Sequence, residues 1–236
     1  MIPVNMICRG NIAVCSVPKI SSNGLYFPER GNSRHFPVTE AVPMSIILLD
    51  IGNVVVTVDF LVFCNAVAMD PVSGAQEIYR KYCIGELKDK LETGLIGPFE
   101  YLDVIACDPH SRTMPLNELK HRWQNIFALL EGAQESVRQL KEKHSVWIMS
   151  DTDPHHFTFL LNNFPLLRGA DRYYLSYEHG NMKHSVEAFE HVLASSGRGA
   201  DEFILIDDKV ENCVSASTVG IESILFQNWE DTLALL

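Results

Sequence analysis

Short, continuously apolar runs alternate with helical stretches along most of the chain after Met44. The apolar runs are residues 46–49, 146–149, 173–175, 203–206 and 223–226. Runs that are apolar at every position, rather than at every second one, are typical of strands covered by helices on both faces. Alternation of such strands with helices predicts the α/β class, with a parallel sheet sandwiched by helices.

Residues 60–132 interrupt this alternation, because they lack a convincing strand and favour helices such as 73–82 and 116–130. An all-helical block directly after the first strand predicts an insertion over the strand ends. We therefore expect a helical cap at 60–132 and a core made of 44–59 plus 133–236.

The first 43 residues differ in composition, with Gly, Pro, Ser and Asn in short alternation and only Glu29 and Glu40 acidic. They lack the charged segment and long apolar segment of a secretory signal. We expect a poorly ordered N-terminal extension at 1–43. An added β-element is the alternative, because residues 11–15 could pair with a sheet edge.

The composition and net charge of the chain limit the classes of partner that it can bind. Of 236 residues, 47% are apolar and 21% charged, as in globular proteins. The net charge of −11, with no block of Lys or Arg, argues against nucleic acid as a partner. No apolar run reaches the length of a membrane span. Six scattered cysteines without a CxxC pair favour reduced thiols and a cytoplasmic protein, which we expect to be a monomer or homodimer.

Polar residues follow three of the predicted strands where each strand ends. Asp50 follows the first, Ser150-Asp151 the second, and Asp207-Asp208 the fourth. Open α/β sheets bind ligands outside the carboxyl ends of their strands, so these side chains should meet there. Carboxylates that lie so near one another need a cation between them. Mg²⁺ prefers oxygen ligands, and it is often bound by one or two carboxylates together with a substrate phosphate.

Lys183 lies in the glycine-containing approach to a helix, after the third predicted strand. Its ammonium could neutralise one carboxylate and hold a phosphate. A small phosphorylated metabolite is therefore compatible with the acidic chain, because one metal ion reverses the local charge.

This order of groups resembles the four motifs of the haloacid dehalogenase (HAD) superfamily, and the resemblance runs from Met44 to Leu236. It is closer still to a subgroup similar to bacterial alpha-D-glucose-1-phosphate phosphatase. The shared segments are Asp50-Ile51-Gly52-Asn53-Val54, Asp59-Phe60, Glu92-Thr93-Gly94, the stretch from Pro115-Leu116 to Trp123-Gln124 and Phe127, and Asn212.

The resemblance implies a Rossmann-like core with an inserted helical cap. It also implies a Mg²⁺-dependent phosphatase of small phosphorylated metabolites, in particular sugar phosphates, that works through an aspartyl-phosphate. Asp50 would be the nucleophile and Lys183 its catalytic partner. The implied phosphate-binding residues are Ser150, Asp151, Gly52, Asn53 and Lys183, and the implied Mg²⁺ ligands are Asp50, Gly52, Asp207 and Asp208.

Three residues depart from the pattern of the superfamily. Gly52 stands where most of its phosphatases carry an acid/base Asp, Asp151 replaces an Asn of the close relatives, and His184 replaces a proline. A catalytically silent relative that binds a ligand or protein is therefore an alternative to the phosphatase, and a haloacid dehalogenase that needs no Mg²⁺ is a third.

Other polar residues admit more than one interpretation. Adjacent helical residues point about 100° apart, so His155 and His156 are expected to be surface or cap-facing rather than a zinc site. Asp59, Glu92 and Asn212 could serve structure or contact substrate.

Overall fold

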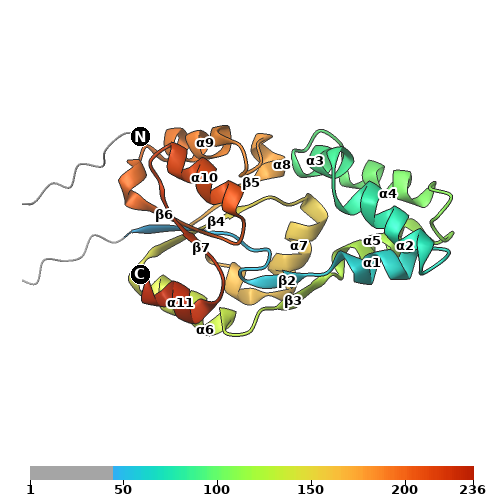
Figure 1. Ribbon diagram of the computed structural model, residues 1–236, viewed down its shortest axis with the longest axis horizontal. Helices are drawn as coiled ribbons and strands as arrows, with labels where there is room; N and C mark the ends of the chain where they lie inside the picture. The colour runs from blue at the N-terminus through green and yellow to red at the C-terminus, as the bar shows by residue number, and fades with distance from the viewer. Residues whose placement is uncertain (1–44) are drawn as a thin grey trace, which may run out of the picture. The chain divides into compact units, whose positions relative to one another are not determined.

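The computed structural model describes residues 45–236, and the extension predicted at 1–43 lies outside them. Five parallel strands form the central sheet in the order β5-β4-β1-β6-β7 (Figure 1). They are β1 (Ile46–Leu49), β4 (Ser145–Ser150), β5 (Arg172–Leu175), β6 (Phe203–Asp207) and β7 (Glu222–Leu225). The α/β prediction is confirmed.

Helices cover both faces of this sheet, and its central strand β1 is accordingly apolar and buried at every position. α6 (Ala133–Lys143), α7 (Pro154–Asn163) and α11 (Trp229–Ala234) pack on one face, and α9 (Val186–Ser196) and α10 (Val210–Thr218) on the other. In β1, Ile47 and Leu49 face the first layer, and Ile46 and Leu48 face the second. Short helical turns lie at Pro165–Leu167, Ser176–His179 (α8) and Ala200–Glu202.

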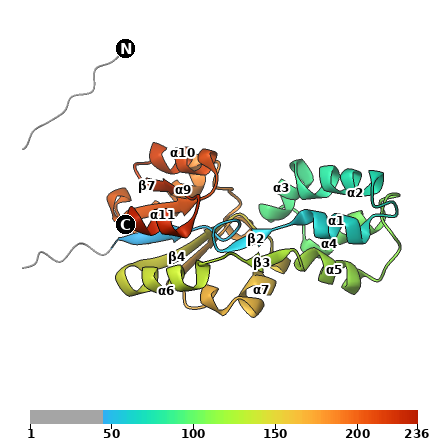
Figure 2. The same ribbon diagram turned by 60° about the horizontal axis from the view of Figure 1, so that its bottom comes forward.

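A second group of helices, between β1 and β4 in the sequence, has an apolar core of its own (Figure 2). It contains α1 (Phe60–Val67), α2 (Ser73–Ile78), a π-helical segment (Tyr79–Cys83), α3 (Glu86–Glu92), α4 (Pro98–Ala106) and α5 (Leu116–Gln124). We call these helices the cap. In the described part of the chain, every helix is too short or too polar to cross a membrane.

The connection between this cap and the sheet corrects the sequence prediction. The predictions of a helix over 116–130 and of a block without strands were wrong. α5 ends at Gln124, and β3 (Phe127–Leu129) pairs antiparallel with β2 (Val56–Val58). Apolar residues at 126, 127 and 130 happen to fit helical spacing, and a three-residue strand is too short to display a period of two. The chain therefore enters and leaves the cap through a two-stranded ribbon.

The cap is bonded to the core through α5 and α7. Asp153 caps α7 by accepting bonds from the backbone N–H groups of His155 and His156, and it also accepts a bond of 3.1 Å from the indole of Trp123. His155 and His156 are both buried. His156 stacks on Trp123 with ring centroids 4.6 Å apart. Of the two placements expected for these histidines, surface or cap-facing, the structure has the cap-facing one, with His155 against Phe99 and His156 against Trp123.

A second contact lies on the opposite side of the cap. Gly94, just past the end of α3, has a φ of 72°, and a Cβ built on it would lie 2.4 Å from the carbonyl oxygen of Tyr177 in α8. Only glycine allows this approach of the two backbones.

Candidate active site

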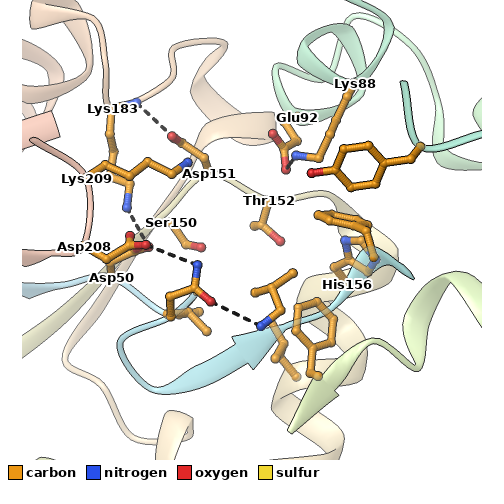
Figure 3. Close-up of a pocket in the computed structure, with 18 residues that line it drawn as sticks. Asp50, Lys88, Glu92, Ser150, Asp151, Thr152, His156, Lys183, Asp208 and Lys209 are labelled. Atoms are coloured by element: carbon orange, nitrogen blue, oxygen red, sulfur yellow. Dashed lines mark hydrogen bonds and ion pairs between the residues drawn. The ribbon is translucent and has the colours of Figure 1, made fainter. Parts of the chain in front are cut away.

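Three neighbouring strands bring the predicted polar residues to one edge of the sheet. β1 lies between β4 and β6 in parallel register, so Asp50, Ser150 and Asp207 end their strands side by side. The backbone N–H of Asp50 donates to the carbonyl of Ile206 at 3.0 Å, which fixes the turn that follows β1. Figure 3 shows Asp50 and Ser150, with Asp208 and Lys183, around one pocket.

Lys183 connects two of the carboxylates. Its Nζ lies 2.6 Å from Oδ1 of Asp50 and 2.6 Å from Oδ2 of Asp207, and the residue is buried. Burial alone would lower the pKa of Lys183, but the charges of Asp50 and Asp207 outweigh it and raise the pKa. Lys183 is therefore a fixed cation between two strand ends.

Asp207 is fully buried and its two oxygens are both engaged. Oδ2 accepts from Lys183, while Oδ1 accepts from the backbone N–H of Lys209 at 3.0 Å and from Nδ2 of Asn212 at 2.8 Å. The geometry gives Asp207 the role of holding Lys183, and gives Asn212 a structural role behind it.

The carboxylates suit a divalent cation. Oxygens of Asp50, Asp207 and Asp208 lie within 4.8 Å of one another, and Oδ1 of Asp208 is buried without a hydrogen-bond partner. Burial, followed by the charges of Asp207 and Asp208, raises the pKa of Asp50 to about 7 against the opposing effect of Lys183. Lys183 pairs with Asp50 and Asp207 but not with Asp208, and a hard cation such as Mg²⁺ would balance the remaining negative charge.

The loop after β1 positions Asn53 beside Asp208. Asn53 has a φ of 54°, which asparagine tolerates better than most residues. Its Nδ2 donates to Oδ2 of Asp208 at 3.2 Å, and its Oδ1 accepts from the backbone N–H of Val58 at 3.3 Å. The Asn53 side chain thus orients Asp208 and ties β2 to the site. Gly52 lines the pocket beside them.

Asp151 and Ser150 lie differently although they are adjacent. Ser150 is buried and lines the pocket. Oδ1 of Asp151 accepts the backbone N–H of Lys183 at 3.0 Å, which joins the loop after β4 to the loop that carries Lys183. The Asp151 carboxylate, which is the extra negative group at this position, therefore helps to position Lys183.

The pocket has a volume of about 270 Å³ and extends from these groups to the cap. Sequence analysis missed several residues that line it: Val58, Tyr79, Lys88, Thr152, Leu160 and Lys209. Thr152 directly follows Ser150-Asp151, and Lys209 directly follows Asp207-Asp208. Their places in the sequence could therefore have identified them as pocket residues. Lys88 and Glu92 are four residues apart on α3, and that spacing places both on one helix face.

No family model matches this chain. A D-ribitol-5-phosphate phosphatase of Bacteroides thetaiotaomicron is 24% identical over 192 residues, covering 78% of this chain and 93% of that protein. A sesquiterpene phosphatase of Aspergillus oryzae is 28% identical over 109 residues, covering 46% of this chain and 45% of that protein.

Solved structures give the same class of fold. A HAD family enzyme from Bacteroides thetaiotaomicron, in complex with magnesium and inorganic phosphate, superposes with a TM-score of 0.67 at 24% identity, covering 80% of this chain and 98% of that one. A predicted HAD-like family hydrolase from Porphyromonas gingivalis gives 0.66 at 17% identity, covering 82% and 98%. This chain has the HAD-family hydrolase fold, as its sequence motifs predicted. Its place in the glucose-1-phosphate subgroup stays a prediction.

Proposed function

We propose that this protein is a Mg²⁺-dependent phosphatase of small phosphorylated metabolites, in particular sugar or polyol phosphates. The observation that supports this most strongly is the grouping of buried Asp50 and Lys183 with half-buried Asp208. There, one carboxylate oxygen of Asp50 contacts Lys183 and the other is left for attack. A nucleophile, a fixed cation and an acidic metal position are the parts that phosphoryl transfer requires.

In the first step of this proposal, Oδ2 of Asp50 forms a bond to phosphorus and the bond from phosphorus to the substrate oxygen breaks. The electron pair leaves with that oxygen, which takes a proton from water and departs as an alcohol. Ser150, the backbone N–H of Asp151 and Lys183 hold the phosphoryl oxygens while charge develops on them.

In the second step, water attacks the phosphorus of the aspartyl-phosphate and gives its proton to solvent. The bond between phosphorus and Asp50 breaks, the electron pair returns to the carboxylate, and inorganic phosphate leaves. Splitting the reaction in this way replaces one difficult displacement by two easier ones.

Asp208, whose buried Oδ1 has no protein donor, would hold Mg²⁺ together with the carbonyl of Gly52 and Oδ1 of Asp50, which leaves Oδ2 of Asp50 for attack. Asp207 would act through Lys183 or a water. When bound, Mg²⁺ supplies the positive charge that lets an anionic carboxylate approach an anionic phosphate.

The substrate class rests on the similar phosphatases and on the size of the pocket. A ribitol 5-phosphate or a related five- or six-carbon phosphate is the first compound to test. The cytoplasmic location and the monomeric or dimeric state remain predictions from the sequence.

A panel of phosphorylated metabolites, assayed for phosphate release with and without Mg²⁺, tests the proposal. We expect release from sugar or polyol phosphates that stops when EDTA is added, and a loss of at least ~10³-fold in Asp50→Asn, as for other enzymes that lose a nucleophile. The inactive variant also shows that the release does not come from a contaminant.

Two outcomes would overturn the proposal in favour of its alternatives. A folded protein that binds Mg²⁺ and hydrolyses no phosphate on the panel would indicate a silent relative. Metal-independent halide release from a 2-haloacid would indicate a dehalogenase.

A further inference from the structure

Lys88 and Glu92 form an ion pair at the cap end of the pocket. Their side chains are 14% and 8% exposed, and both line the pocket. Figure 3 shows the pair across the pocket from Asp50 and Asp208. It therefore faces the position that the non-phosphate part of a substrate would occupy.

The same helix carries a second ion pair that serves as an internal comparison. Lys90 and Glu86 also lie four residues apart on α3, but their side chains are 44% and 84% exposed. An exposed pair of this kind is easily hydrated and contributes at most about 1 kcal/mol. Each ion of a pair that is withdrawn from water loses several kcal/mol of hydration free energy. A protein with apolar residues of similar size in place of such a pair is often equally stable. Helix stability therefore does not account for Lys88 and Glu92.

One part of the pocket wall is apolar and contrasts with these charges. Val58, Phe60, Phe127 and Leu160 provide apolar walls, and Lys88 Nζ lies 5.4 Å from the centre of the Phe60 ring. A volume of about 270 Å³ is near the lower end of the ~300–1,000 Å³ typical of ligand sites, so the ligand is small. Among the apolar walls, the pair offers one group that accepts hydrogen bonds and one that donates them.

We propose, as an extension of the proposed phosphatase function, that Lys88 and Glu92 select substrates whose leaving group carries neighbouring hydroxyls, such as five- or six-carbon polyol and sugar phosphates. A carboxylate oxygen of Glu92 accepts a hydrogen bond from one hydroxyl, and the ammonium of Lys88 donates to the next. A leaving group without hydroxyls displaces water from both charges and replaces none of its hydrogen bonds.

The test compares two substrates of equal chain length, a five-carbon polyol 5-phosphate and n-pentyl phosphate. The measured quantity is the ratio of their kcat/KM values. Hydrogen bonds to charged groups contribute about 1.5–3 kcal/mol, so the wild-type ratio should favour the polyol phosphate by about 10–100-fold. In the double variant Lys88→Met/Glu92→Met the ratio should fall at least ~10-fold.

The matched control is Lys90→Met/Glu86→Met, which removes an ion pair of the same spacing from the exposed side of α3. This control should keep the wild-type ratio. Circular dichroism and the melting temperature of both double variants separate a change in specificity from a loss of fold.

The outcomes that overturn the inference differ from those that overturn the phosphatase function. If the wild type hydrolyses both substrates equally, or if Lys88→Met/Glu92→Met lowers both values equally, the pair does not select hydroxyls. If Mg²⁺-loaded wild type releases phosphate from neither these substrates nor any other phosphate monoester, the proposed function itself has failed.

Discussion

The ammonium nitrogen of Lys183 lies 2.6 Å from Oδ1 of Asp50, and both residues are buried. The contact joins the loop after β1 to the loop before α9. Since it engages one oxygen of Asp50, it fixes the carboxylate in one orientation and directs the other oxygen away from Lys183. Rigid positioning of this kind matters because a displacement of the nucleophile by 1 Å can cost about 10²-fold in rate.

Removing Lys183 should damage both fold and chemistry. Lys183→Met leaves Asp207 fully buried without its cation, and breaking such a pair typically costs about 3–5 kcal/mol. We expect a clear drop in the free energy of unfolding measured in urea, together with loss of turnover. Asp50→Asn is the control, because it preserves the Lys183–Asp207 bond and should melt close to wild type. Equal stability of Lys183→Met and wild type would contradict this account of Asp207.

Protonation of Asp153 should lower the free energy of unfolding at acidic pH. Burial alone would raise its pKa, but His156 and the bonds from Trp123 and the backbone outweigh it, and the pKa lies at about 2. Its ionised form therefore stabilises the fold fully above the unfolded pKa near 4, and this contribution is lost as pH falls through about 2. The depressed pKa corresponds to about 2 kcal/mol.

Urea unfolding of wild type and Asp153→Asn between pH 2.5 and 6 measures this contribution. The variant should be less stable at pH 6, because Asn leaves His156 without its carboxylate partner at 2.8 Å. The difference between the two proteins should shrink as the pH falls. Parallel pH profiles would show that Asp153 does not supply the acid dependence.

The close contact between Gly94 and Tyr177 should determine the position of α3, and therefore of the cap, relative to the core. Gly94→Ala would push against the Tyr177 carbonyl and shift α3, which carries Lys88 and Glu92. We expect kcat/KM to fall about 10-fold or more, consistent with misplacement of a substrate-positioning element.

Two other glycines supply matched controls for that variant. Gly85→Ala imposes the same left-handed backbone strain, with a φ of 85°, but a Cβ there meets nothing within 4 Å. Gly97 has an ordinary φ of −75° and equally open space, so Gly97→Ala tests the substitution alone. If Gly85→Ala lowers kcat/KM as much as Gly94→Ala, backbone strain rather than the clash is responsible.

Gly52 should make hydrolysis faster for leaving groups that need little protonation than for those that need more. General acid help contributes about 10²–10⁴-fold, and an anomeric phosphate needs less of it than an ordinary alkyl phosphate. Wild type should therefore hydrolyse sugar 1-phosphates faster than 6-phosphates. Gly52 lies outside the left-handed region, and a Cβ there would lie 3.4 Å from Cγ2 of Val58, so Asp can be placed there.

Gly52→Asp should narrow the gap between 1- and 6-phosphates, as measured by kcat/KM for both. Gly52→Asn is the control, since it has the same shape and no titrating proton. A wild type that prefers 6-phosphates would refute the argument from the leaving group.

Sequence patterns revealed the sheet because each strand is a continuous apolar run, and every predicted strand end lies within one residue of the observed one. They also brought Asp50, Ser150 and Asp207 together, because the carboxyl ends of adjacent parallel strands necessarily meet. What the sequence could not reveal depends on contacts between distant segments. His156 is buried only because Trp123 stacks on it, and Lys88 faces Asp50 only because the cap docks on the core.

The ribbon of β2 and β3 has a consequence for how such a molecule can diversify. Val58 and Phe127 are paired across it, so the chain departs from the core and returns to it at adjacent points. The strands before and after this excursion, β1 and β4, are themselves neighbours in the sheet. A segment attached in this way can be exchanged for another without rearranging a single core strand. If the cap selects the substrate and the core carries the phosphate chemistry, as proposed, the two properties can change independently, with the ribbon as the junction between them.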